Sequence, residues 1–133
     1  MRAERNPDPQ AWDEFVENHP RAHILQTSGW GALKAGFGWT ADRVALYDGN
    51  AIVAAAQVLT RPLPLGLRLA YVPKGPVVDL DRADLCTPLF TALRRLCRRR
   101  RAFALKIEPD LPESPDLAAR LAPYGFRSST HNI

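Results

Sequence analysis

The sequence predicts an α/β or α+β fold, in which a mixed sheet is flanked by helices. Apolar residues recur at helical spacing in some segments and at every second position in others, and the two patterns alternate along the chain. A length of 133 residues is enough for one hydrophobic core, so we treat residues 1–133 as a single domain. No apolar run approaches the roughly 20 residues of a membrane span, and the charged N-terminal segment differs from a signal peptide. We therefore expect a cytoplasmic protein.

Two helices are expected before the first strand. Asp8-Pro9 is typical of a helix start, and three apolar residues of the following segment are spaced to share one side. These residues are Trp12, Phe15 and Val16. Ser28 is expected to cap the second helix, because its hydroxyl can accept a backbone hydrogen bond, and Gly36 is expected to end it.

Three strands are expected in the middle of the chain. Residues 43–47 and 52–59 are rich in β-forming side chains, and the Asp-Gly-Asn turn at 48–50 tolerates positive φ, so these two runs predict a hairpin. Residues 67–72 predict a third strand, which should end at the two prolines of residues 73–76.

The C-terminal half is expected to add two helices and two strands. The longest helix should cover residues 83–101, with an apolar side and an arginine-rich side. A strand follows at 103–107, where we expect Phe103 to lie in the core. A short helix over 114–121 and a last strand over 126–133 complete the prediction. An open edge on that last strand would favour a homodimer.

The two cysteines are expected to be core thiols. Cys86 and Cys97 lie eleven residues apart in the long helix, which separates them by about 16 Å, too far for a disulfide. The histidines have no metal-ligand spacing either. We therefore predict no metal site.

The order of elements matches the layout of the GNAT acyltransferase fold, and four segments refine that match. They are 25–34 (LQTSGWGALK), 71–79 (YVPKGPVVD), 105–109 (LKIEP) and 124–127 (YGFR). Together they resemble the FemABX family of peptidoglycan-bridge aminoacyltransferases. The resemblance implies two GNAT-like domains in tandem, of which residues 1–133 correspond to the first, with the second absent from this sequence.

The resemblance also implies a reaction. Family members transfer an amino acid from aminoacyl-tRNA to the stem peptide of a peptidoglycan precursor, which is UDP-linked or lipid-linked. This chain would be the precursor-binding half, inactive in isolation and located in the cytoplasm or at the inner face of the membrane. No cofactor is implied, because aminoacyl-tRNA enters as an already activated co-substrate.

Two site residues follow from the resemblance. Lys34 matches the family lysine that binds the precursor's diphosphate, although a solvated helix lysine is the alternative interpretation. Glu108 matches an acidic residue near the incoming amine, which a carboxylate can hold or deprotonate as a catalytic group. The alternative for Glu108 is a strand-end carboxylate paired with Lys106. Phe103 replaces a tyrosine found in some relatives, so any hydroxyl contact there is lost.

Further candidates come from local chemistry. Lys74 and Gly75 are candidate substrate-binding residues, since glycine permits close approach and lysine can meet a phosphate or carboxylate. The alternative is a tight turn between two prolines. The run Arg98, Arg99, Arg100 and Arg101 is a candidate tRNA or phosphate contact, with stabilisation of the helix C-terminus as the alternative. A net charge of +4 favours an anionic partner in a general way.

Two other functions are compatible with the sequence. The first is a small GNAT N-acetyltransferase that uses acetyl-CoA. Pro73 and Pro76, however, lie where that fold usually offers backbone N–H groups to the CoA pyrophosphate, and proline has none to offer. The second is a non-catalytic module that binds the precursor or RNA through Lys34 and the arginines.

Overall fold

The computed structural model describes residues 1–112 and 114–128. The helices are α1 (Pro9–Asn18), α2 (Ser28–Ala35), α3 (Ala83–Arg100) and α4 (Pro115–Leu121). The strands are β1 (Arg2–Arg5), β2 (Thr40–Asp48), β3 (Ala51–Pro62), β4 (Arg68–Val72) and β5 (Ala104–Ile107). Short 3-10 turns are η1 (Ile24–Gln26), η2 (Pro64–Gly66) and η3 (Ala122–Tyr124). Within these described ranges, no helix has the length and apolar character needed to cross a membrane.

The strands form one mixed sheet in the order β1-β2-β3-β4-β5. Neighbours from β1 to β4 are antiparallel, whereas β4 and β5 are parallel and are joined by the crossover helix α3. Tyr71 lies opposite Lys106 and Val72 opposite Ile107, so the C-terminal ends of β4 and β5 lie side by side. The N–H of Glu108 donates to the carbonyl of Val72 at 3.1 Å. Residues that follow the two strands are therefore brought together.

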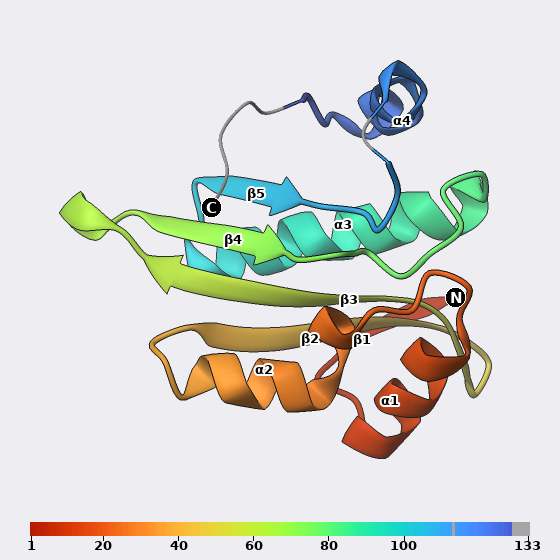
Figure 1. Ribbon diagram of the computed structural model, residues 1–133, viewed down its shortest axis with the longest axis horizontal. Helices are drawn as coiled ribbons and strands as arrows, with labels where there is room; N and C mark the ends of the chain where they lie inside the picture. Colours follow the sequence, from red (N-terminus) through yellow and green to blue (C-terminus); the bar gives the residue numbers. More distant parts are fainter. Residues whose placement is uncertain (113, 129–133) are drawn as a thin grey trace.

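Helices cover both sides of the sheet (Figure 1). Successive strand residues face opposite sides, and each side carries an apolar cluster that packs against helices. Val44 and Val58 pack in the core on the α3 side. Ala45 and Ala55, from the same two strands, pack with Trp12 of α1 on the other side. α2 lies on the α1 side, against β2 and β3.

Most of the expected elements are confirmed. The hairpin forms from β2 and β3, and Gly49 in its turn has a φ of 62°. Asp8 caps α1 by accepting a hydrogen bond from the N–H of Ala11 at 3.1 Å. The long helix has the expected apolar side, and it ends where Arg101 adopts the left-handed conformation with a φ of 57°. Local patterns were sufficient for these elements.

Two expectations at the N-terminal end were wrong. A strand, β1, precedes both helices and pairs with β2, although all four of its residues are exposed. The cap of α2 is Thr27, whose hydroxyl accepts from the N–H of Trp30 at 3.3 Å, and not Ser28. The hydroxyl and N–H of Ser28 instead donate to the carboxylate of Asp13 in α1. Ser28 thus ties the two helices together.

Two expectations at the C-terminal end also need correction. Phe103 is 61% exposed and is not a core residue, because β5 begins at Ala104 and Phe103 precedes it at the end of the sheet. Residues 126–128 form no strand, and the rest of the strand expected over 126–133 lies outside the described residues. The homodimer expected from an open edge of that strand therefore stays a prediction.

The expectation that the cysteines are core thiols is confirmed. Both are free, Cys86 is buried, and Cys97 packs against the same core while remaining partly exposed. Burial is the largest cause that raises the pKa of each thiol. Both thiols are therefore protonated at neutral pH.

Candidate functional site

The side of the sheet that carries α2 also carries three of the residues predicted from the sequence. Ala70 and Val72 face the α3 core, so Tyr71 between them faces the α2 side. Lys34 projects from α2, and Lys74 and Glu108 follow β4 and β5. We term the surface formed by Lys34, Arg61, Tyr71, Lys74 and Glu108 the α2-side surface.

Glu108 is held by two donors at the end of β4. The hydroxyl of Tyr71 donates to Oε2 of Glu108 at 3.1 Å, and Nζ of Lys74 lies 3.5 Å from Oε1. Lys74 follows β4 and has a positive φ of 52°. The structure thus places Glu108 against Lys74, where the sequence had offered Lys106 as the alternative partner. The Glu108 side chain is still 42% exposed, so a ligand can reach it.

The phenol of Tyr71 has a strongly shifted pKa. Burial, followed by the nearby Glu108 carboxylate, raises the pKa of Tyr71 to about 12 from an ordinary value of 10.0. Both causes oppose formation of a second negative charge beside Glu108. Tyr71 is therefore a permanent hydrogen-bond donor to Glu108 at physiological pH.

This shift predicts a pH dependence of stability. A folded-state pKa above the unfolded value contributes stability below pH 10, and that contribution is lost as the pH rises from 10 to about 12. Tyr71→Phe lacks the titrating group, so its free energy of unfolding should fall less steeply than that of the wild type in this window. Urea denaturation at a series of alkaline pH values measures the difference. Parallel curves for the two proteins would contradict the assignment.

Gln26 of η1 supports the turn that presents Lys74. The β3–β4 ladder ends at Leu59 and Tyr71, and beyond it the Gln26 side chain fills the gap between the two segments. Its Nε2 donates to the carbonyl of Pro73 at 2.7 Å, and its Oε1 accepts from the N–H of Gln57 at 2.8 Å. The side-chain amide therefore substitutes for a peptide group in the sheet.

Gly75 permits this arrangement. A Cβ at position 75 would lie 2.8 Å from Cδ of Gln26 and 2.9 Å from Cγ1 of Val72, distances that real side chains do not show. The close approach that Gly75 allows is thus to the buried Gln26. The conformation of the 73–76 turn, and with it the position of Lys74, depends on the absence of a side chain at Gly75.

Lys34 lies among aromatic rings on the same side of the sheet. Its Nζ is 5.2 Å from the ring centre of Trp30 and 5.7 Å from that of Trp39, both within cation–π range. The guanidinium carbon of Arg61 is 5.2 Å from the ring of Trp39. No contact described for this part of the chain joins Lys34 to the Lys74–Glu108 pair, so the α2-side surface has two separate polar groups.

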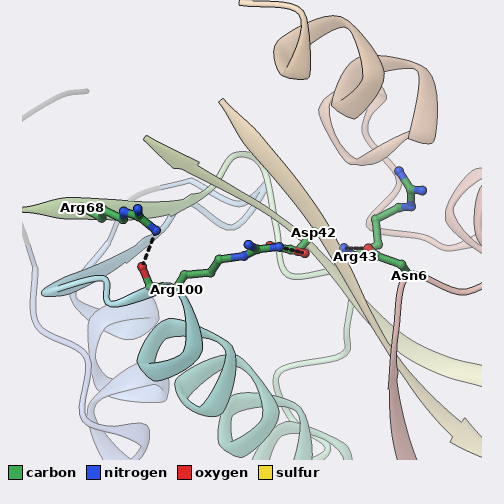
Figure 2. A network of polar contacts seen from close by, with 5 residues as sticks. All are labelled: Asn6, Asp42, Arg43, Arg68 and Arg100. Atoms are coloured by element: carbon green, nitrogen blue, oxygen red, sulfur yellow. Dashed lines mark hydrogen bonds and ion pairs between the residues drawn. The ribbon is translucent and has the colours of Figure 1, made fainter. Parts of the chain in front are cut away.

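The arginine run does not form one uniform patch. Arg100 makes two hydrogen bonds to the carboxylate of Asp42, at 2.8 and 2.9 Å, and its carbonyl accepts from Arg68 at 3.3 Å (Figure 2). The Asp42 side chain is only 1% exposed, so this pair is part of the fold. Arg98, Arg99 and Arg101 remain exposed. These three are the members of the run that a phosphate can reach.

No group of three or more His, Cys, Asp or Glu side chains gathers in the described part of the chain in a way that could hold a metal ion.

The mixed sheet and its helices define a GNAT-like domain. A crystal structure of a ribosomal-protein-alanine N-acetyltransferase from Brucella melitensis superposes with a TM-score of 0.66 at 14% identity, over 100% of this chain and 96% of that one. The crystal structure of FemX matches better, with a TM-score of 0.85 and 29% identity over 94% of this chain and 32% of its own. The first likeness shows the fold alone.

Sequence comparison identifies the family. The FemAB family model matches residues 8–119, and the chain belongs to this family. It is 32% identical over 125 residues to a lipid II:glycine glycyltransferase of Staphylococcus saprophyticus, covering 92% of this chain and 30% of the relative. For the same enzyme of Staphylococcus aureus, identity is 31% over 121 residues, or 89% of this chain and 29% of the relative. The chain thus spans about a third of the length of these relatives.

Proposed function

We propose that this chain is the precursor-binding part of an aminoacyltransferase that extends the stem peptide of a peptidoglycan precursor. The donor is aminoacyl-tRNA, and the acceptor is a UDP-linked or lipid-linked precursor in the cytoplasm or at the inner membrane face. The proposal assigns precursor binding, and not a complete transfer reaction, to these 133 residues. Family membership and the glycyltransferase relatives support the general reaction.

One observation carries the assignment of the site. Glu108 is contacted by Tyr71 and Lys74 at the end of two parallel strands, and its side chain is still partly exposed to solvent. A carboxylate held in this way is suited to bind the ammonium group of a stem peptide through a charge-assisted hydrogen bond. Lys74 was expected to contact the substrate directly. In this proposal it instead positions Glu108 through their ion pair.

The chemistry needs little from the protein beyond positioning. Once the stem-peptide amine is neutral, its nitrogen attacks the carbonyl carbon of the aminoacyl ester. A C–N bond forms, the ester C–O bond breaks, and the ribose oxygen of the tRNA leaves with a proton. In this proposal Glu108 holds the ammonium and accepts the proton that the ammonium loses. Orientation of the two reactants supplies the remaining acceleration.

A separate surface is proposed for the tRNA. Arg98 and Arg99 at the end of α3, together with Arg101, are exposed and can neutralise backbone phosphates without reading sequence. Arg100 is excluded from this role because it is bound to Asp42.

The test of the proposal is precursor binding by the purified chain. Calorimetric titration with a UDP-linked muropeptide should show binding that Lys34→Ala weakens by about tenfold or more, since a cation that binds phosphate is lost. Arg95→Ala, which removes the same charge from the exposed part of α3, is the matched control and should bind like the wild type.

Two results would contradict the proposal. Equal affinity in wild type and Lys34→Ala would remove Lys34 from the precursor site. Binding of acetyl-CoA in a parallel titration, without binding of the muropeptide, would indicate an acetyltransferase instead.

A further inference from the structure

Arg61 and Lys34 both contact the ring of Trp39. Arg61 lies near the end of β3, and Trp39 precedes β2. The guanidinium carbon of Arg61 and Nζ of Lys34 lie 5.2 and 5.7 Å from the centre of the same Trp39 ring. One indole therefore holds two cations on the α2-side surface.

The two cations are not neutralised by the protein. Among the described residues, neither Arg61 nor Lys34 forms an ion pair, and Nε of Arg61 is buried without a hydrogen-bond partner. No Asp or Glu occurs between Glu17 and Asp42, which covers α2. None occurs between Gly49 and Val78 either, which covers β3 and β4. Their distances to one ring centre, 5.7 and 5.2 Å, keep the two charges within about 11 Å of each other, and an anion that contacts both would relieve their mutual repulsion.

We propose that Arg61 is the second cation of a diphosphate site, with Lys34 as the first and Trp39 as the ring that orients both. This inference rests on the proposed function and deepens it by identifying how the precursor's diphosphate is held. A guanidinium is planar and can donate two parallel hydrogen bonds to phosphate oxygens, while the ammonium of Lys34 supplies a compact charge. The site would therefore distinguish a diphosphate-linked precursor from the same sugar-peptide without its diphosphate.

The sheet register places this site at a useful distance from Glu108. Arg61 lies opposite Leu69, and two residues earlier Leu59 lies opposite Tyr71, so Arg61 and Tyr71 face the same side. Glu108 follows β5, two strands away from β3. Strand spacing and rise put the Arg61 and Glu108 backbones on the order of 15 Å apart. An extended precursor can span that distance with its diphosphate at Arg61 and its amine at Glu108.

The experiment compares three ligands and four proteins. The ligands are inorganic pyrophosphate, a UDP-linked muropeptide, and the same sugar-peptide without the diphosphate. The proteins are wild type, Arg61→Gln, Arg61→Lys and the control Arg95→Gln, each checked for folding by circular dichroism. We expect Arg61→Gln to weaken both phosphate-containing ligands by about tenfold or more, and Arg61→Lys to weaken them less. Affinity for the diphosphate-free ligand should not change.

The outcomes separate this inference from the proposed function. If Lys34→Ala weakens muropeptide binding but Arg61→Gln does not, the role of Arg61 is overturned and the proposed function stands. If Arg95→Gln has the same effect as Arg61→Gln, only net charge matters and the inference fails. An equal loss of affinity for the diphosphate-free ligand would also overturn it, because that result indicates a merely structural role. If Arg61→Gln does not fold, Arg61→Lys provides the test. An affinity of Arg61→Lys for the phosphate-containing ligands equal to that of the wild type would overturn bidentate binding by Arg61. No binding by the wild type would overturn both proposals.

Discussion

Arg100→Gln is expected to lower the free energy of unfolding by about 3 to 5 kcal/mol. The Asp42 carboxylate is 1% exposed, and Arg100 supplies its two side-chain hydrogen bonds, at 2.8 and 2.9 Å. Removal of the guanidinium leaves a buried negative charge without compensation, which costs more than the intact pair contributes. Urea denaturation of the purified chain, followed by circular dichroism, measures the change.

Two controls establish the cause of this loss. Arg99→Gln changes an exposed neighbour in the same helix and should stay within about 0.5 kcal/mol of the wild type. The double variant Asp42→Asn/Arg100→Gln should be more stable than Arg100→Gln alone, because it removes the uncompensated charge. A loss below about 1 kcal/mol in Arg100→Gln would mean that water reaches Asp42 and that the pair is dispensable.

The Asp42–Arg100 pair illustrates why neighbours in sequence need not share a function. Consecutive helix residues are rotated by about 100°, so a run of four arginines cannot point in one direction. Arg100 turns toward the sheet and contacts Asp42 of β2 (Figure 2). Arg98 and Arg99 are exposed to solvent. The sequence correctly located positive charge at the end of the helix. It contained no signal that one member of the run had a buried partner 58 positions earlier in the chain.

The elements that could be predicted are those with local causes. The hairpin follows from its turn residues, and α3 follows from apolar spacing over 18 residues. β1 has the sequence RAER, with neither alternation nor β-branched side chains, and it is a strand because β2 offers it an edge. Its existence is a property of the assembled sheet, which local pattern cannot report.

The candidate site likewise contains residues that the sequence predicts and residues that only the folded structure identifies. Lys34, Lys74 and Glu108 are predicted singly from short segments, but their partners Tyr71 and Trp39 are not. Tyr71 reaches Glu108 only because β4 and β5 are parallel and in register, and that register is set by the crossover through α3. Arg61 meets Trp39 through the fold of β3 against the segment before β2. A strand-end arginine in sequence carries no indication of that contact.

Gln26→Leu is the second substitution with a large expected effect, a loss of about 3 to 5 kcal/mol in the free energy of unfolding. Gln26 is fully buried, and leucine has a similar size but cannot form hydrogen bonds. The carbonyl of Pro73 and the N–H of Gln57 would both lose their side-chain partner, and an unsatisfied buried polar group costs about 1 to 3 kcal/mol. The turn that carries Lys74 would also relax, so affinity for the UDP-linked muropeptide should fall in the fraction of protein that remains folded.

The same substitution at Gln10, an exposed residue of α1, is the matched control and should change stability by less than about 0.5 kcal/mol. Urea denaturation of both variants gives the comparison, and titration of each folded variant with the muropeptide tests the link to binding. A stability loss without a change in affinity would show that Lys74 does not depend on Gln26. A loss below about 1 kcal/mol would instead mean that water replaces the side-chain amide between β3 and the turn, so that the gap at the end of the ladder is a hydrated one.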